Sequence, residues 1–362
     1  LTMMMSEKSK QHVDSCRFCW MCHHICPVGN ATGQERNTAR ARALGISLVN
    51  RGAIDLSEVV DNVYECATCG ACVHDCTTGW DPVMFTKETR LQAALDGKLP
   101  DYIAVLVDNC LTAGNAYGKT ELSAELAVAI AAHSKKTDTL LYLGVDAMYM
   151  APELAVKAIR VLEKAGVDFT VLADEPASGA QLDFLIGAAQ EAKDQMTKAA
   201  TVINEYETIV VYEPVDAKLI MRTYKEYSIG ISAKVQTYTT CLADLVASGK
   251  LTGKKVDKVV TIQDPYALAR DLGETQPVRD VVGHFATLQE MLLHGAETVW
   301  AGDILMAQYV PNVIQKVSCR RINNAVSLGY TAMVAVGAAE YTALKNAEQS
   351  QVEILCLEDL IL

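Results

Sequence analysis

The chain has 362 residues, half of them hydrophobic, and a formal net charge of −12 at pH 7. This composition permits a sizeable core and two or three domains, and it argues against disorder. The acidic balance argues against nucleic acid and an anionic membrane surface as partners, because both attract cationic patches.

No run approaches the ~18 consecutive apolar residues that a membrane-spanning helix needs, so we expect no transmembrane segment. Residues 1–10 are too short and too polar to be a secretory signal, and three methionines at positions 3–5 offer alternative starts. We therefore expect a cytoplasmic protein, which at most lies peripherally at a membrane through a partner.

The first predicted element is a cysteine-rich loop, and the chain repeats it some fifty residues later. Both copies read C-x2-C-x2-C-x3-C, a spacing that is associated with pairs of [4Fe–4S] clusters. A zinc site fits poorly, because it needs only four ligands, usually in two separated pairs. The eight residues are Cys16, Cys19, Cys22 and Cys26 in the first copy, and Cys66, Cys69, Cys72 and Cys76 in the second.

The spacing also predicts how the thiols divide between the clusters. Three thiolates two residues apart reach three corners of one cubane, whereas the fourth lies where the chain leaves the loop and reaches the neighbouring cubane. The first cluster is therefore assigned Cys16, Cys19, Cys22 and Cys76, and the second Cys66, Cys69, Cys72 and Cys26. Two adjacent clusters would form a relay for single electrons.

Other residues of the motifs are interpreted from the cysteines that lie next to them. Trp20 is expected to cover the first cluster from water. Because every cysteine position is filled, we expect the histidines of the motifs to lie beside the clusters or to face solvent: His23, His24 and His74.

The segment between the motifs is predicted to form a helix, a turn at Arg51–Gly52 and a second helix. Its three arginines are interpreted as a solvated face, in preference to a docking patch or compensation for anionic clusters: Arg36, Arg40 and Arg42.

The rest of the chain is predicted to begin with helices and to continue as α/β structure. Residues 81–97 read as a turn and a helix, 108–120 as a loop, and 121–133 as a helix. From about Thr139, apolar runs alternate with helices, which predicts a largely parallel sheet covered by helices. Because the order recurs, we expect two similar halves. Strands are predicted at 139–144, 168–173, 208–214, 258–265, 297–302 and 331–337.

These elements predict four segments along the chain. An α-helical, ferredoxin-like domain for two [4Fe–4S] clusters occupies residues 1–100, and a connecting loop and helix occupy 101–136. The two α/β halves, with mainly parallel sheets, follow at 137–250 and 251–362. Four cysteines outside the motifs are expected to fill the core, the usual position of a free thiol: Cys110, Cys241, Cys319 and Cys356.

The paired motifs, the doubled α/β region and one loop together resemble the cysteine-rich (CCG-domain) iron–sulfur oxidoreductases. That family includes the heterodisulfide reductase D-subunit and the iron–sulfur subunits of anaerobic glycerol-3-phosphate dehydrogenase and glycolate oxidase. The loop is "AGNAYG", which is similar to the family's GNPxG with Ala116 in place of proline.

The resemblance also shows what this chain lacks. In relatives of the reductase type, cysteines in each half bind a catalytic cluster, whereas here the matching positions carry no thiol. They fall on Val145, Ala177, Ser178 and Glu213 to Asp216 in the first half, and on Tyr266, Trp300, Ala301 and Ala335 to Ala339 in the second. Because such clusters need thiolate ligands, the resemblance implies duplicated, degenerate CCG-like halves that bind no cluster and dock partners.

Two of the replacing residues, Glu213 and Asp216, are oxygen donors. Two carboxylates alone are a weak case for a metal, so we favour a solvated or structurally paired position for them.

We therefore expect an electron-transfer iron–sulfur subunit of a multi-subunit oxidoreductase, more than a catalytic subunit. The resemblance implies an FAD-containing dehydrogenase subunit as partner, with further electron-transfer subunits as additional candidates. No G-x-G-x-x-G follows a predicted strand, so no nucleotide site is expected in this chain. Two alternatives stay open, namely a catalytic subunit like heterodisulfide reductase and a protein whose clusters are purely structural.

Overall fold

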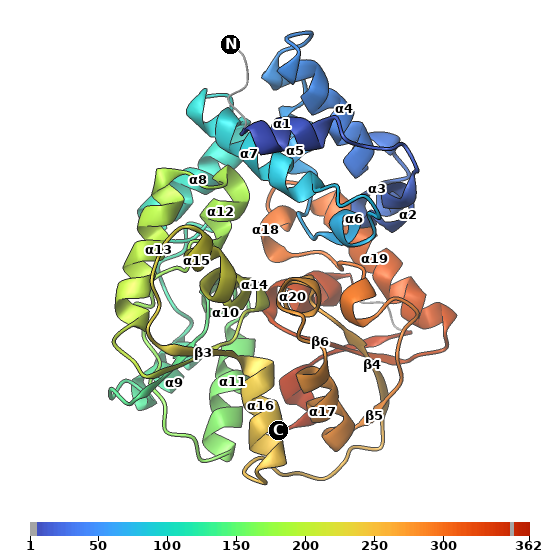
Figure 1. Ribbon diagram of the computed structural model, residues 1–362. Coiled ribbons are helices and arrows are strands. Elements are labelled where there is room, and N and C mark those ends of the chain that lie inside the picture. Colours follow the sequence, from blue (N-terminus) through green and yellow to red (C-terminus); the bar gives the residue numbers. More distant parts are fainter. Residues whose placement is uncertain (1–5, 348–350) are drawn as a thin grey trace.

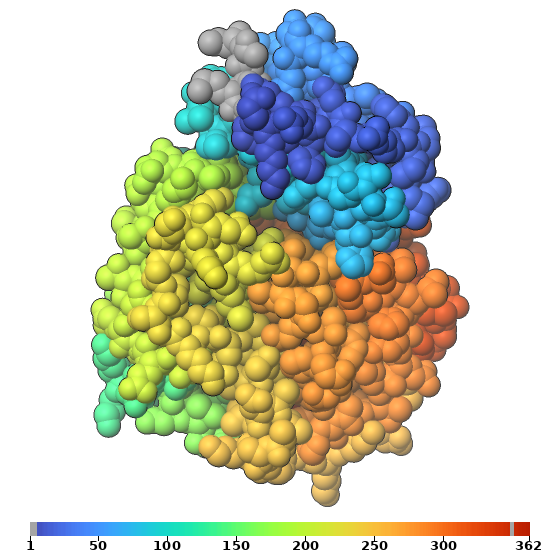
Figure 2. All heavy atoms as spheres, in the orientation of Figure 1, coloured from blue at the N-terminus to red at the C-terminus, as the bar shows by residue number. Residues whose placement is uncertain are grey.

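The computed structural model describes residues 6–347 and 351–362, so the three N-terminal methionines lie outside the described residues. A layer of N-terminal helices covers one end of two α/β halves that lie side by side (Figures 1 and 2). Within the described ranges, no helix combines the length and the apolar character that crossing a bilayer requires.

The N-terminal layer is built from short helices joined by loops. Helix α7 begins where Asp81 accepts a hydrogen bond from the backbone N–H of Met84, and Pro82 occupies its first turn, where no N–H partner is needed. The helices are α1 (Glu7–Val13), α2 (Met21–Ile25), α3 (Pro27–Thr32), η1 (Glu35–Asn37), α4 (Ala39–Asn50), η2 (Leu56–Glu58), α5 (Val60–Tyr64), α6 (Ala71–His74) and α7 (Pro82–Leu95).

Two helices, α8 (Asp101–Ala113) and α9 (Ala124–Ala132), connect this layer to the first half. The predicted loop at 108–120 is therefore wrong over its first six residues. Ile103, Leu106 and Cys110 are buried at helical spacing, and this apolar face outweighs the polar residues between them.

The first half contains a three-stranded parallel sheet in the order β1-β2-β3. Its strands are β1 (Thr139–Tyr142), β2 (Thr208–Val211) and β3 (Lys234–Thr237). Its helices are α10 (Val145–Tyr149), α11 (Pro152–Lys164), α12 (Ala180–Ile186), α13 (Gln190–Ile203), α14 (Pro214–Lys218), the π-helix η3 (Leu219–Thr223), α15 (Tyr224–Glu226) and α16 (Tyr238–Ala247).

The second half contains a four-stranded parallel sheet in the order β5-β4-β6-β7. Its strands are β4 (Val259–Gln263), β5 (Thr287–Leu288), β6 (Ala332–Ala335) and β7 (Glu353–Cys356). Its helices are the π-helix η4 (Ala267–Leu272), α17 (Gln276–Phe285), η5 (Gly295–Glu297), α18 (Ile304–Ala307), α19 (Pro311–Ser327), α20 (Ala338–Asn346) and η6 (Leu357–Leu360).

Two predicted strands do not form. Residues 168–173 make only one bridge, between Thr170 and Leu140. Residues 297–302 form no strand because side chains take their carbonyl groups: Arg270 donates to the carbonyl of Thr298, and Gln263 to that of Val299 at 3.0 Å. The sequence did not predict β3, whose polar residues give no apolar run, or β5, which is only two residues long.

Two arginines hold the second cysteine loop against both halves. Fully buried Arg90, on α7, donates to the carbonyl of Cys66 at 2.6 Å and to that of Phe184, in the first half, at 2.7 Å. Arg270, on η4 of the second half, donates to the carbonyl of Cys69 at 2.8 and 3.1 Å as well as to that of Thr298. The loop is therefore fixed at a junction of three parts of the molecule.

We expect Arg270→Met to lower the free energy of unfolding by about 2–4 kcal/mol, because it leaves buried carbonyl groups without donors. Anaerobic urea unfolding would measure the change. Arg160→Met is the matched control, because the Arg160–Glu125 ion pair is 57% and 65% exposed and such pairs contribute little. Equal losses in the two variants would show that Arg270 does not hold the parts together.

Candidate functional site: two thiol pockets and a carboxylate cavity

The two cysteine loops have the same unusual backbone. Phe18 and Trp20 in the first loop, and Thr68 and Gly70 in the second, have positive φ at matching positions. Among the described residues, only one other non-glycine residue, Ser228, has positive φ. This conformation costs about 1–2 kcal/mol for each non-glycine residue, so the loops store strain, which is typical of functional sites.

The strained loops direct backbone N–H groups at sulfur atoms. The N–H of Phe18 lies 3.4 Å from Sγ of Cys16, and the N–H of Thr68 lies 3.4 Å from Sγ of Cys66. At the fourth cysteine of the second motif, Trp80 donates its N–H to Cys76 at 3.4 Å. Such donors favour a negatively charged sulfur.

The first pocket, here called the outer thiol pocket, has a volume of about 20 Å³. Four of its lining residues are cysteines, three from the first motif and one from the second: Cys16, Cys19, Cys22 and Cys76. Burial raises the pKa of Cys22 to about 11. Although burial opposes it, hydrogen bonds from Thr78, Trp80 and Gly79 lower the pKa of Cys76.

The second pocket, here called the inner thiol pocket, has a volume of about 30 Å³. It gathers the other four motif cysteines: Cys26, Cys66, Cys69 and Cys72. Burial raises the pKa of Cys69 to about 11, and burial together with the neighbouring thiols raises the pKa of Cys72. A strong Lewis acid is therefore needed to ionise these thiols, as iron does.

The spacing of the thiols fits a polynuclear cluster better than a single ion. Zn–S bonds of about 2.3 Å place tetrahedral ligand sulfurs within about 4 Å of one another. Among the described residues, no three cysteine sulfurs all lie within 4.8 Å of one another. The residues present therefore fit [4Fe–4S] clusters, whose four ligand sulfurs are spread over the corners of a cubane.

The two pockets differ in how deeply their cysteines are buried: Cys19 of the outer thiol pocket is exposed, whereas Cys69 of the inner one is buried. The side chains around Cys19 remain accessible, with Phe18 54% and Trp20 45% exposed. By contrast, Ala67 and Cys69 of the inner pocket belong to an apolar cluster with Tyr266 and Trp300 of the second half.

The interpretation of the three arginines as a solvated face is wrong for two of them. The guanidinium of Arg40 lies 3.8 Å from the centre of the Trp20 ring and lines the outer thiol pocket. Arg42 is 3% exposed, lines the inner thiol pocket and donates to the carbonyl of Asn62 at 3.0 Å. Arg36 is 55% exposed and pairs with Glu65.

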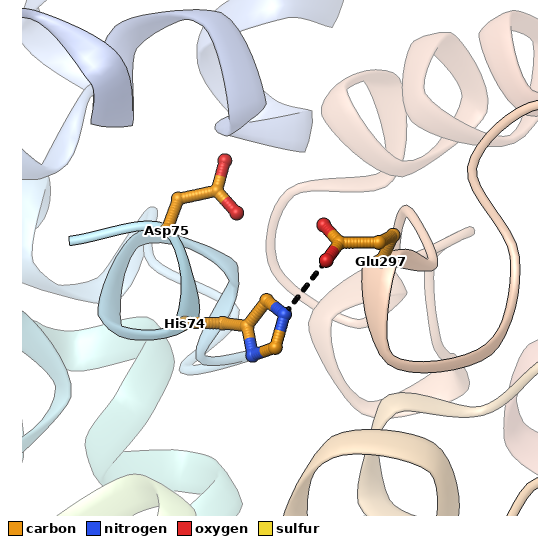
Figure 3. A group of neighbouring side chains, drawn as sticks. All are labelled: His74, Asp75 and Glu297. Atoms are coloured by element: carbon orange, nitrogen blue, oxygen red, sulfur yellow. Dashed lines mark hydrogen bonds and ion pairs between the residues drawn. The ribbon is translucent and has the colours of Figure 1, made fainter. Parts of the chain in front are cut away.

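The three motif histidines are absent from the lining of both thiol pockets. His74 instead lies 2.9 Å from a carboxylate oxygen of Glu297, which comes from η5 of the second half (Figure 3). Asp75 completes the group, whose ligand atoms lie within 4.8 Å of one another on the surface. This contact links the N-terminal layer to the second half beside the arginine-held loop.

A third cavity, of about 60 Å³, lies where the two halves meet, and we call it the carboxylate cavity. Seven of its 17 lining residues lie just after strands β1, β2, β4 and β6, which is the usual ligand position in parallel sheets. Several walls are positions that the resemblance assigned to lost cysteines: Val145, Ala177, Ser178, Glu213, Asp216, Tyr266 and Ala339. Trp300 and Ala301 are buried outside this lining.

Glu213 and Asp216, expected in solvated or paired positions, are 3% and 5% exposed. Asp216 accepts a hydrogen bond from Ser178, and Glu213 accepts one from the N–H of Ala338 at 2.7 Å. Burial raises the pKa of Asp216 to about 7 and, together with the charge of Asp146, raises the pKa of Glu213.

The sequence analysis missed two further acidic residues of this cavity, Asp146 and Asp303. Burial raises the pKa of both, to about 7 for Asp303. Both could have been found from their positions in the sequence. Asp146 directly follows Val145, and Asp303 directly follows Gly302, and the resemblance matches Val145 and Gly302 to family motifs.

Comparison with known proteins identifies the N-terminal part. Residues 12–80 match the 4Fe-4S dicluster domain family. The chain is 26% identical over 269 residues to a probable membrane-anchored ferredoxin of Chromohalobacter salexigens, an alignment that covers 71% of this chain and 39% of that protein.

The chain is also similar to the D-subunit of dihydromethanophenazine:CoB–CoM heterodisulfide reductase. It is 26% identical over 305 residues to the protein of Methanosarcina acetivorans and 25% over 314 residues to that of Methanosarcina mazei, covering 75% of this chain and 73% of each relative. No solved structure matches. The predicted resemblance is confirmed: the relatives and the dicluster domain are consistent with a CCG-type iron–sulfur family.

The raised pKa of Asp216 predicts a pH dependence of stability. Its ordinary value is 3.8 and its native value about 7, so between these pH values the native state keeps a proton that the unfolded state has lost. Stability therefore falls as pH rises through this window, by up to about 1.4 kcal/mol per pH unit for one group.

We expect the apparent thermal midpoint to fall between pH 6 and 7.5, and to fall less steeply in Asp216→Asn. Asp138→Asn, which removes an exposed carboxylate, serves as the control and should keep the original slope. An unchanged slope in Asp216→Asn would contradict the raised pKa.

Proposed function

We propose that this chain is an electron-transfer subunit of a multi-subunit oxidoreductase, and that it relays single electrons between a flavin-containing partner and a downstream acceptor. An iron–sulfur electron-transfer function follows from the dicluster domain and the similarity to the heterodisulfide reductase D-subunit. The finer proposal depends mainly on one observation: the eight motif cysteines line two pockets, one with an exposed cysteine and one with a buried cysteine.

The proposed ligands of the first cluster are Cys16, Cys19, Cys22 and Cys76, and those of the second are Cys66, Cys69, Cys72 and Cys26. When bound, a [4Fe–4S] cluster accepts and releases one electron at a time. The protein's own residues hold the sulfurs in place. Backbone N–H groups donate to them, and Arg90 and Arg270 fix the loop of the second set.

The two thiol pockets differ in the side chains that surround them. Tyr266 and Trp300 belong to the same apolar cluster as Cys69 of the inner thiol pocket. Around the outer thiol pocket, Arg40 stacks on Trp20 while Phe18 stays exposed. This side therefore suits electron exchange with a docked partner, for which we propose an FAD-containing dehydrogenase subunit at a cytoplasmic or peripheral membrane location.

The α/β halves, proposed at residues 137–250 and 251–362, are a duplicated CCG-like scaffold without a cluster. The walls of the carboxylate cavity, all of them described residues, include no cysteine. The similarity to the reductase D-subunit favours a second candidate, a catalytic subunit with its own cluster in these halves. Iron content separates the two, because two cubanes account for about eight irons per chain and a third cluster adds more.

Cysteine variants test the crossed ligand sets. In anaerobically purified protein, Cys16→Ala and Cys76→Ala should remove the same electron paramagnetic resonance signal of the reduced state. Cys66→Ala and Cys26→Ala should remove the other, and each variant should lose about half of the iron. Cys319→Ala, outside both pockets, should keep both signals. Pairing of Cys76 with Cys66 would overturn the crossed arrangement.

Reductive titration tests the relay against purely structural clusters. Two signals that appear and disappear reversibly at potentials accessible to flavins support electron transfer. Clusters that stay in one state until they decompose would show that they only hold the fold together. Anaerobic purification with the native partner should also recover an FAD-containing chain.

A further inference from the structure

The carboxylate cavity has two kinds of wall. Apolar side chains cover one part, including Val145, Phe184, Val215 and Leu305. Four acidic side chains line the rest: Asp146, Glu213, Asp216 and Asp303. A cavity of about 60 Å³ is several times the space that one buried water needs, so it calls for an explanation of its own.

The acidic side chains lack a matching positive charge. The lining residues of the cavity include no lysine, arginine or histidine. Arg90 is the cation whose charge reaches Asp303, but its guanidinium donates to the carbonyl groups of Val63, Cys66 and Phe184. Buried carboxylates without a cation are costly, and their mutual repulsion adds to the cost.

Two of the carboxylates also keep one oxygen available. Asp146 accepts hydrogen bonds from Tyr117 at 2.6 Å and Gln181 at 2.9 Å, both on Oδ1. Asp216 is 5% exposed and accepts from Ser178 on Oδ1. Among the described residues, neither Oδ2 atom has a hydrogen-bond donor, although both side chains line the cavity.

We propose that this cavity binds a small organic cation, a protonated amine carried on an apolar skeleton. The amine would contact the carboxylates, and the skeleton would lie against Val145, Phe184 and Leu305. The mixed walls match such a ligand in both charge and polarity.

Other ligand classes fit less well. An anion would meet only acidic charges. A bare metal ion needs several ligand atoms close together, and among the described residues only the surface group of His74, Asp75 and Glu297 places three such atoms within 4.8 Å of one another. The cavity carboxylates are therefore too widely spaced for one ion, whereas an amine with a carbon skeleton can fill the space between them.

Benzylamine and benzyl alcohol form a matched pair of probes, since they share the ring and differ in charge. Isothermal titration of the anaerobic holoprotein at pH 7.5 should show saturable 1:1 binding of benzylamine. Benzyl alcohol should bind at least about tenfold more weakly, the equivalent of 1.4 kcal/mol. Absent benzylamine binding, or equal affinity for the two probes, would overturn the proposal.

Variants locate the binding. Asp216→Asn keeps the acceptor for Ser178, and Asp303→Asn keeps the acceptor that caps α18 at the N–H of Met306. Each should weaken benzylamine at least about fivefold and leave benzyl alcohol unchanged. Asp138→Asn, at the surface, should change neither.

Val215→Phe narrows the cavity without touching a carboxylate and should abolish binding of both probes. This variant still tests the proposal if an aspartate variant fails to fold. Wild-type affinity in Val215→Phe would place the amine outside the cavity and overturn the proposal.

Discussion

The fold and the candidate site both depend on two guanidinium groups that hold one cysteine loop. Arg90 binds the carbonyl of Cys66 from the N-terminal layer, and Arg270 binds that of Cys69 from the second half. A guanidinium with five donors can satisfy several carbonyl groups at once, which suits a junction where no regular strand or helix can pair the backbone. The same contacts that join the parts therefore fix the inner thiol pocket.

Local sequence signals predicted much of this architecture. The helical and strand patterns gave most elements of both halves, because each apolar run was buried within its own element. Predictions failed where distant groups decided the conformation. Residues 297–302 form no strand because Arg270 and Gln263 take their carbonyl groups, and Arg42 is buried where it donates to the carbonyl of Asn62, twenty residues away. Neither contact can be read from neighbouring residues.

The candidate site shows the same division. Cysteine spacing predicted two sets of four thiols, and the same two sets line the two pockets, while their assignment as cluster ligands stays a prediction. The resemblance located positions where thiols are missing, and the structure gathers many of them around one cavity. The sequence did not reveal which residues surround these positions in the folded chain. Asp146 and Asp303 join that cavity only through the meeting of the two halves, and their raised pKa values result from that burial.

The proposed exchange of the fourth cysteine between the motifs would have a consequence for biosynthesis. Neither set of four thiols is complete until the end of the second motif has left the ribosome, because the outer pocket needs Cys76 and the inner pocket needs Cys72. The second cysteine loop can bind the second of its two arginines only after Arg270 has been translated. Between residues 76 and 270 the nascent chain therefore carries both complete thiol sets without the Arg270 contact that joins the second cysteine loop to the second half.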